Sequence, residues 1–256
     1  MSNIIPTSDL NILIKNVDKG VLVLYDINET LITYPESRRL FRAPNTEHLK
    51  KMFAKLQERY PDQYIEIRNR LFETNTIQLS DPKFTDLINK CKEKDTPFLC
   101  FTAIRTGLAN QHQSELTEDK WVKLLADFNL DKQYNVNFSG INEARLPHLR
   151  IDPTLQPFMQ NNDAMIKDGI VFCNNINKGY IIHLIMVYLE IINKKPHSVI
   201  MLDNRLENLV DVDEQLKKYK IPFIGIYYTK IIEEEANLPP IDDDYIDKLI
   251  DELNIQ

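Results

Sequence analysis

The sequence lacks any apolar run long enough to cross a membrane. A membrane-spanning helix needs about 20 consecutive apolar residues, and no stretch of the 256 residues approaches that length. The N-terminus also lacks the basic segment followed by an apolar core that marks a secretory signal. We therefore expect a protein without a membrane span, located in the cytoplasm or delivered by a specialised secretion system.

Cysteine and net positive charge are also scarce. The three cysteines are odd in number, lie in apolar stretches and lack metal-ligand spacing, so we expect small core residues in a reducing compartment. The formal net charge of −7 argues against nucleic acid or an anionic membrane as the main partner. No internal repeat or low-complexity linker divides the chain, and its length suits one large domain or a core with a smaller insert.

What the sequence does contain is three short apolar runs, each of which ends in a polar residue. The runs and the residues that follow them are 21–25 before Asp26, 98–101 before Thr102, and 198–202 before Asp203 and Asn204. Runs of this length are typical of strands buried on both faces. Open α/β sheets bind their ligands at the carboxyl ends of such strands. Asp26 taken alone could equally cap a turn.

A long amphipathic helix begins near Lys178 and Gly179. Its apolar residues recur at helical spacing from Ile181 to Ile192, which is the clearest helical pattern in the chain. Strands that alternate with helices in this way predict an α/β fold, with a Rossmann-like parallel sheet between layers of helices.

The helical pattern of residues 34–80 interrupts the alternation between the first and second core strands. We expect a core domain of residues 1–33 and 81–256, with residues 34–80 as a helical insert. An ordinary crossover with an extra helix pair is the alternative. Residues 140–168 are irregular and contain three prolines, so they are a candidate for a second small insert.

The order of four polar residues resembles the four motifs of the haloacid dehalogenase (HAD) superfamily. These residues are Asp26, Thr102, Lys178 and Asp203, each at an expected strand end or helix start. The resemblance spans about residues 18–230 and implies a HAD-like core, with residues 34–80 as a cap over the active site. Residues 169–203, with the irregular stretch before them, also resemble an uncharacterised bacterial subfamily found largely in intracellular bacteria.

The resemblance implies a Mg²⁺-dependent phosphatase that acts on phosphate monoesters, because most members of that superfamily work through an aspartyl-phosphate. Asp26 would be the nucleophile, Thr102 and Lys178 would bind the phosphoryl group, and Arg105 could add positive charge. The metal ligands would be Asp26, Asn28 through its backbone carbonyl, Asp203 and Asn204. The substrate would be a phosphorylated small molecule or a phosphoprotein.

Two asparagines depart from the superfamily's pattern, in its first and fourth motifs. Asn28 stands where the phosphatases usually carry the aspartate that acts as general acid and then general base, and an amide can do neither. Asn204 replaces a second aspartate, for which Glu207 could substitute as an outer-shell carboxylate.

Without the acid, hydrolysis of alkyl phosphates should suffer most, so aryl phosphates or phosphotyrosine-like esters are favoured. The same asparagines leave open a second interpretation. In that interpretation the protein is a catalytically weak or inactive pseudoenzyme that binds phosphate or protein, and could be a secreted bacterial effector.

Overall fold

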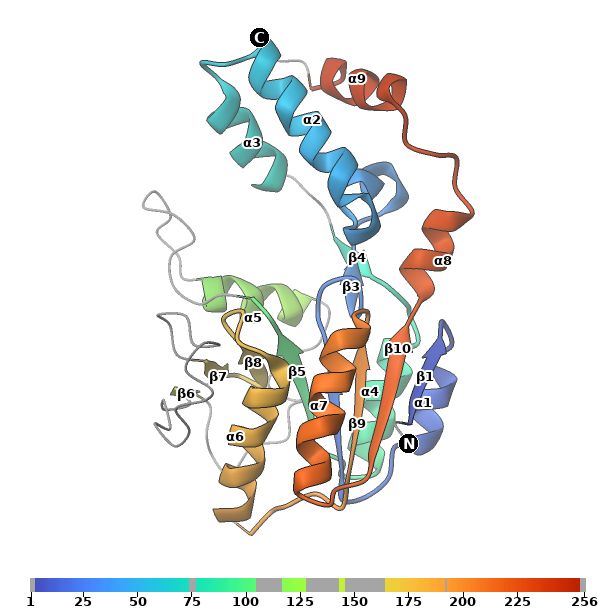
Figure 1. The fold of residues 1–256 in the computed structure, drawn as a ribbon, viewed down its shortest axis with the longest axis vertical. Helices are drawn as coiled ribbons and strands as arrows, with labels where there is room; N and C mark the ends of the chain where they lie inside the picture. The colour runs from blue at the N-terminus through green and yellow to red at the C-terminus, as the bar shows by residue number, and fades with distance from the viewer. Residues whose placement is uncertain are drawn as a thin grey trace. The chain divides into compact units, whose positions relative to one another are not determined.

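The computed structural model describes residues 3–73, 77–104, 117–127, 143–145, 164–191 and 193–253. The chain forms two compact units, and each unit combines two separate segments (Figure 1). The first unit contains Met1–Leu31 and Asp81–Thr229, and the second contains Ile32–Ser80 and Lys230–Gln256.

The first unit is built on an eight-stranded sheet with the order β1-β10-β9-β2-β5-β8-β7-β6. The first six strands in this order run parallel, whereas β7 and β6 are antiparallel to their neighbours. The strands are β1 (Ile4–Thr7), β2 (Val21–Tyr25), β5 (Phe98–Thr102), β6 (Glu143–Arg145), β7 (Met165–Lys167), β8 (Ile170–Phe172), β9 (Ser198–Asp203) and β10 (Phe223–Tyr228).

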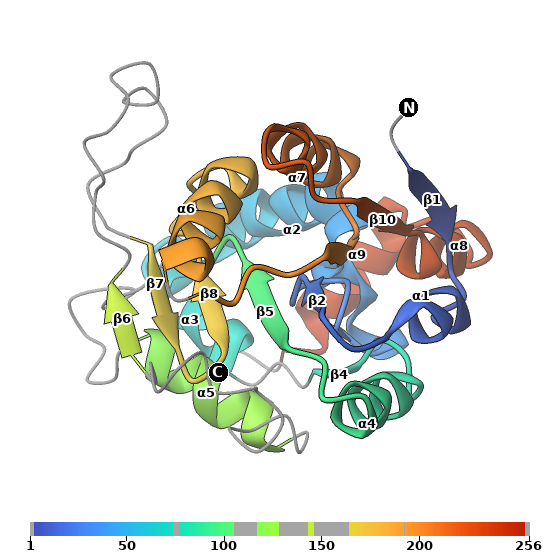
Figure 2. The same cartoon turned by 90° about the horizontal axis from the view of Figure 1, so that it is seen from below.

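Helices cover both faces of this sheet. Figure 2 shows α6 and α7 on one face and α1, α4 and α5 on the other. The helices are α1 (Asn11–Asn16), α4 (Phe84–Glu93), α5 (Thr117–Asp127), α6 (Lys178–Ile191) and α7 (Leu206–Lys218). The expected α/β fold with a mostly parallel central sheet flanked by helices is therefore confirmed, and it is consistent with a Rossmann-like arrangement.

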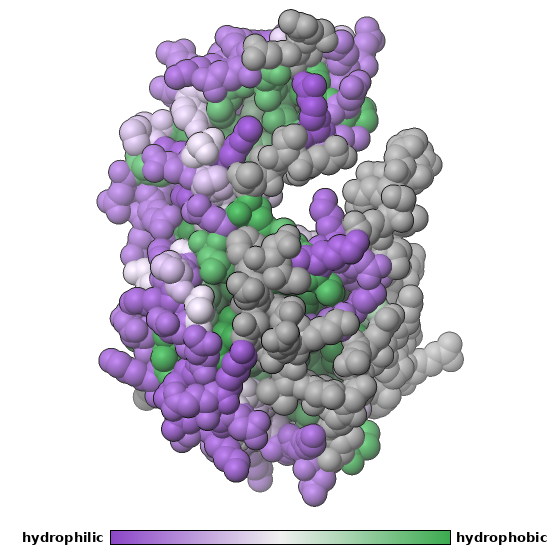
Figure 3. All heavy atoms as spheres, turned by 180° about the vertical axis from the view of Figure 1, so that it is seen from behind, coloured by the Kyte–Doolittle hydropathy of each residue, from purple (hydrophilic) through white to green (hydrophobic). Residues whose placement is uncertain are grey.

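The apolar runs of the sequence form the interior of the first unit. Every residue of β2 and β5 is buried, as expected for strands covered on both faces. The three cysteines are free and buried, and burial raises the pKa of each thiol to about 12. On the face drawn in Figure 3, hydrophilic residues make up most of the coloured surface.

The second unit consists of a short antiparallel strand pair and several helices. The pair is formed by β3 (Ile32–Thr33) and β4 (Gln78–Leu79). The helices are η1 (Glu36–Phe41), η2 (Ala43–Asn45), α2 (Thr46–Arg59), α3 (Tyr64–Glu73), α8 (Lys230–Ala236) and α9 (Asp243–Asp251). Residues 34–80 thus contain two α-helices, and their role as a cap stays a prediction.

The C-terminal segment shares one core with residues 32–80, although the sequence placed it with the core domain. Apolar residues of α2 and α3 pack in one cluster with Ile246 and Ile250 of α9. The carboxylate of Glu235 accepts hydrogen bonds from Arg39 at 3.1 Å, Arg42 at 2.9 Å and Asn45 at 2.8 Å. Side chains on α8 and α9 therefore hold the C-terminal segment against residues 32–80 within the second unit.

The candidate second insert, residues 140–168, lies largely outside the described residues. Its described parts include β6 and β7, which extend the sheet of the first unit. Across the described ranges, no helix combines the length and the apolar character that a membrane span requires.

Helices α6 and α7 approach each other closely at Gly179. A Cβ atom at this position would lie 2.5 Å from the backbone oxygen of Asp211 and 2.9 Å from Oδ1 of Asn177. We expect Gly179→Ala to lower the free energy of unfolding by about 1–3 kcal/mol, because the backbone must shift to admit the methyl group. Denaturant unfolding measures this change, with Glu190→Ala on the exposed side of α6 as the control. Equal stability of the Gly179→Ala variant and the wild-type protein would contradict the close packing.

Candidate functional site

Two carboxylates lie side by side at the carboxyl ends of β2 and β9. Asp26 directly follows β2, and Asp203 is the last residue of β9. The strands are parallel neighbours with Tyr25 opposite Leu202, and the backbone N–H of Asp26 donates to the carbonyl of Leu202 at 2.9 Å. The register of two strands thus brings together carboxylates that are far apart in the sequence.

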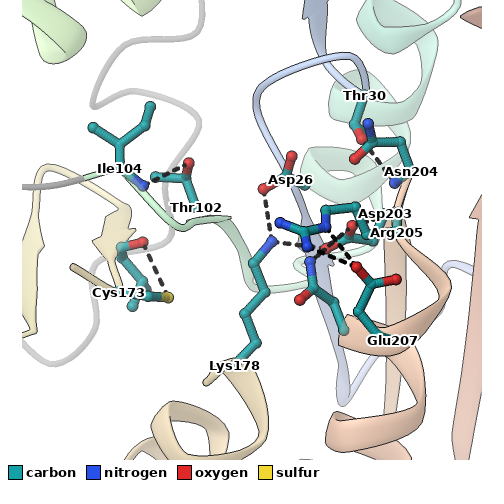
Figure 4. Close-up of polar contacts among 12 residues, drawn as sticks. Asp26, Thr30, Thr102, Ile104, Cys173, Lys178, Asp203, Asn204, Arg205 and Glu207 are labelled. Carbon is teal, nitrogen blue, oxygen red and sulfur yellow. Dashed lines mark hydrogen bonds and ion pairs between the residues drawn. The ribbon is translucent and has the colours of Figure 1, made fainter. Parts of the chain in front are cut away.

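The ammonium group of Lys178 bridges the two carboxylates (Figure 4). Its Nζ atom donates to Oδ1 of Asp26 at 2.6 Å and to Oδ2 of Asp203 at 2.7 Å. Lys178 is only 2% exposed, Asp203 is fully buried and Asp26 is 8% exposed. The bridge is therefore a buried group of three charges, with Asp26 as its most accessible member.

Lys178 is the first residue of α6, and its neighbours fix the start of that helix. The side chain of Asn177 accepts a hydrogen bond from the Tyr180 N–H at 3.1 Å and donates to the Asp211 carboxylate at 2.6 Å. A positive charge at a helix N-terminus opposes the helix dipole. Helix stability therefore does not explain the lysine, and its two carboxylate partners do.

Asp203 accepts four hydrogen bonds. The Arg205 N–H donates to Oδ1 at 2.8 Å, the Asn208 side-chain amide donates to Oδ1 at 3.1 Å and to Oδ2 at 3.0 Å, and Lys178 completes the set at Oδ2. A carboxylate offers about four lone-pair sites, so the partners of Asp203 use all of them.

The sequence suggested Glu207, one helical turn after Asp203, as an outer-shell carboxylate, but the structure contradicts the helical spacing on which that expectation rested. Glu207 instead pairs with the Arg205 guanidinium at 2.7 Å, and both side chains are exposed. The reason is the start of α7: Arg205 is still extended at the N-cap and the helix begins at Leu206. Positions 203 and 207 are therefore not one helical turn apart, and the first turn of α7 presents Asn208 to Asp203.

Burial and charge give the members of the bridge different acid–base properties. Burial raises the pKa of Asp26 to about 6, with Lys178 opposing this shift and Asp203 adding to it. Burial alone would lower the pKa of Lys178, but the two carboxylates outweigh it and raise that pKa above its ordinary value. When all three groups are ionised, two carboxylates and one ammonium leave a net charge of −1 at the site.

The remaining predicted site residues lie around this bridge without joining it. Thr102 is the buried last residue of β5, and its hydroxyl accepts the Ile104 N–H at 3.4 Å (Figure 4). Asn28 is exposed in the turn after β2. Asn204 donates its backbone N–H to the Thr30 hydroxyl at 3.1 Å, which ties the turn after β2 to the turn after β9.

Arg105 lies outside the described residues. Within the parts of the chain that the structure describes, no cluster of three or more histidine, cysteine, aspartate or glutamate side chains could hold a metal ion. A cation at the bridge would therefore take at most two ligands from carboxylates, and it would need backbone, amide, water or substrate oxygens for the rest.

The sheet and the buried bridge define an α/β protein with a polar site at the carboxyl ends of its parallel strands. The chain belongs to the family described as "Protein of unknown function (DUF2608)", whose model matches residues 4–256. It is 26% identical over 236 residues to "Uncharacterized protein RP296" of Rickettsia prowazekii (strain Madrid E), which covers 89% of this chain and 78% of that protein. No solved structure matches the chain.

These comparisons overturn the assignment to the haloacid dehalogenase superfamily. The matching family is one of unknown function and the matching relative is uncharacterised, so neither indicates that superfamily. The four residues that carried the resemblance occupy strand ends and a helix start, where polar residues are common in α/β folds. Their order therefore did not identify a family.

The raised pKa of Asp26 predicts a pH-dependent effect of Asp26→Asn on stability. A raised carboxyl pKa contributes stability that is fully present below the ordinary value of 3.8 and is lost as the pH rises through about 6. The amide carries no charge and can still accept from Lys178. In chelator-containing buffer we expect Asp26→Asn to be more stable than the wild type at pH 8, with a free energy of unfolding up to about 3 kcal/mol higher. At pH 4 the two free energies of unfolding should be nearly equal.

Denaturant unfolding across this pH range measures the effect, with the exposed Asp86→Asn as the control. A variant that is less stable than the wild type at pH 8 would contradict the charge imbalance at the bridge.

Proposed function

We propose that this protein hydrolyses phosphate monoesters, with Asp26 as the nucleophile and Mg²⁺ as the cofactor. The observation that carries the proposal is the Lys178 bridge between Asp26 and Asp203. It sets a carboxylate beside a fixed ammonium group at the strand ends where α/β sheets bind ligands. A phosphorylated small molecule or a phosphoprotein would be the substrate.

The two carboxylates differ in a way that favours Asp26 as the nucleophile. Asp203 is fully buried and its lone pairs are all occupied, whereas Asp26 is 8% exposed and accepts one side-chain hydrogen bond among the described residues, from Lys178. A nucleophile needs an accessible lone pair. Asp26 is therefore the carboxylate that can reach a substrate.

In the proposed reaction an Asp26 oxygen attacks phosphorus while the bond from phosphorus to the ester oxygen breaks. The leaving oxygen takes a proton from solvent, and the phosphoryl group remains on Asp26. Water then attacks phosphorus, which releases inorganic phosphate and restores the carboxylate. Lys178 holds a positive charge beside the reacting oxygens throughout, and Thr102 at the end of β5 is proposed to bind a phosphoryl oxygen.

The charge of the site supports a cation as well. A phosphate dianion would be repelled by the net charge of −1 on the three bridged groups. The donors present fit Mg²⁺, which prefers hard oxygen ligands and commonly combines one or two carboxylates with water and substrate oxygens. Asp26 would hold it, and Asn28 and Asn204, which lie exposed and half-buried beside the strand ends, could add oxygens. Bound Mg²⁺ would neutralise phosphate charge and stabilise the charge that develops in the transition state.

We further propose that the helices of residues 34–80 serve as the cap expected from the sequence. The segment is inserted between β2 and β5, two strands whose ends carry site residues. A cap of this kind excludes water and selects the leaving group.

The decisive experiment is hydrolysis of an aryl phosphate with and without Mg²⁺, with Asp26→Ala beside the wild type. We expect metal-dependent turnover that Asp26→Ala reduces to background, because no phosphoryl acceptor remains. Circular dichroism serves as the control for folding. Metal-independent turnover, or turnover that survives in Asp26→Ala, would contradict the proposal.

A second candidate function is a phosphate- or protein-binding module without turnover. The exposed amide of Asn28 favours it, because an amide cannot supply the proton that a leaving alkoxide needs. Binding of inorganic phosphate by a folded wild-type chain that shows no activity above Asp26→Ala would support this alternative.

The missing proton donor predicts the effect of Asn28→Asp. The turn after β2 exposes position 28 two residues from Asp26, where a carboxyl group could protonate a leaving oxygen. We expect turnover of an alkyl phosphate to rise by about 10²-fold or more, and turnover of an aryl phosphate to rise much less, because general acid catalysis matters most for poor leaving groups. Parallel kcat measurements on both esters test this, with Asn28→Ser as the control. An equal gain on both esters, or none, would rule out the missing acid as the cause.

A further inference from the structure

The four hydrogen bonds on Asp203 restrict what this carboxylate can do. Its partners are Lys178, the Arg205 N–H and the side-chain amide of Asn208, which reaches both oxygens. Direct coordination of a metal would require at least one of these donors to be displaced and left without its partner inside a buried site. Such a loss is costly, since unpaired buried donors are strongly unfavourable.

Asp26 is under no such restriction. It accepts one side-chain hydrogen bond, from Lys178, within the described part of the chain. It is also the only one of the two carboxylates with exposed surface. A cation at the site can therefore reach a lone pair of Asp26 without breaking the bridge.

Asn208 is the residue that orients the buried carboxylate. It lies in the first turn of α7 and donates to Oδ1 at 3.1 Å and to Oδ2 at 3.0 Å. The carboxylate held in this way turns Oδ2 toward Lys178, whose Nζ lies 2.7 Å from it. Asn208 thus acts on Lys178 through Asp203.

We infer that Asp203 is not a direct metal ligand but the fixed counter-charge of Lys178, and that Asn208 is the positioning residue that keeps it in this role. Asp26 then provides the one direct carboxylate ligand. The inference rests on the proposed function. It removes Asp203 from the metal ligands expected from the sequence, which were Asp26, Asn28, Asp203 and Asn204.

The test compares metal binding and turnover in full-length variants. Mn²⁺ alone is titrated into the protein, and the free ion is followed by electron paramagnetic resonance. Asn208→Leu removes the donor at similar size, Asp26→Asn removes the proposed ligand, and Glu207→Gln changes the neighbouring residue, which contacts Arg205 and not Asp203. Asn208→Ser, which keeps one donor, serves as the second variant if Asn208→Leu fails to fold.

We expect Asp26→Asn to weaken Mn²⁺ binding about tenfold or more, and Asn208→Leu to change it less than about threefold. Asn208→Leu should nevertheless lower kcat at least about tenfold with KM nearly unchanged, because Asp203 is then less firmly oriented toward Lys178, which acts mainly in the transition state. Asn208→Ser should fall between Asn208→Leu and the wild type, and Glu207→Gln should match the wild type in both measurements.

The inference is overturned if Asn208→Leu or Asn208→Ser weakens Mn²⁺ binding as much as Asp26→Asn does, since that result would make Asp203 a ligand that Asn208 supports. The proposed function survives this outcome when the wild type still turns over an aryl phosphate. A wild type that binds no Mn²⁺ overturns the inference, and if it also shows no turnover the proposed function falls with it.

Discussion

The site depends on one buried ammonium group shared by two carboxylates. Lys178 reaches Asp26 and Asp203 at 2.6 and 2.7 Å, and its three supports are strand β2, strand β9 and the start of helix α6. A slip of one residue between β2 and β9 would turn one carboxylate to the other face of the sheet. A buried charge left with no partner typically costs about 3–5 kcal/mol, so Lys178 must keep at least one carboxylate, and this contact constrains both the start of α6 and the register of the strands.

The bridge is unbalanced in charge, and this imbalance links stability to chemistry. Two carboxylates face one ammonium. Burial disfavours the charged form of Asp26, whose pKa rises to about 6. Sites that hold such unfavourable groups commonly trade stability for activity. An added cation would relieve the imbalance and at the same time make the site receptive to a phosphate dianion. The excess negative charge that destabilises the bridge is thus also what would attract a cation to it.

The sequence predicted the elements of the site better than the contacts between them. The runs before Asp26, Thr102 and Asp203 form buried strands because they are short and apolar, and the helix after Lys178 follows from its periodicity. The contact between Asn208 and Asp203 could not be found in this way. It depends on the extended conformation of Arg205 and on the start of α7 at Leu206, and the sequence pattern did not define that helix start. The placement of α9 with the second unit depends on apolar contacts between segments about 190 residues apart, which local pattern does not encode. The sequence pattern also did not identify the family, because polar residues at strand ends are common to many unrelated α/β proteins.

The two carboxylates of the bridge show how environment divides roles between identical side chains. Asp203 is surrounded by donors on every lone pair and has no exposed surface, so its charge is held in place and its oxygens are unavailable. Asp26 shares the same lysine but lies just beyond the carboxyl end of β2 with fewer donors, so its oxygens are the more accessible. The same side chain thus differs in accessibility according to how many donors surround it. The distinction comes from Asn208 and the Arg205 N–H, which occupy oxygens of Asp203 and have no counterpart on Asp26 among the described residues.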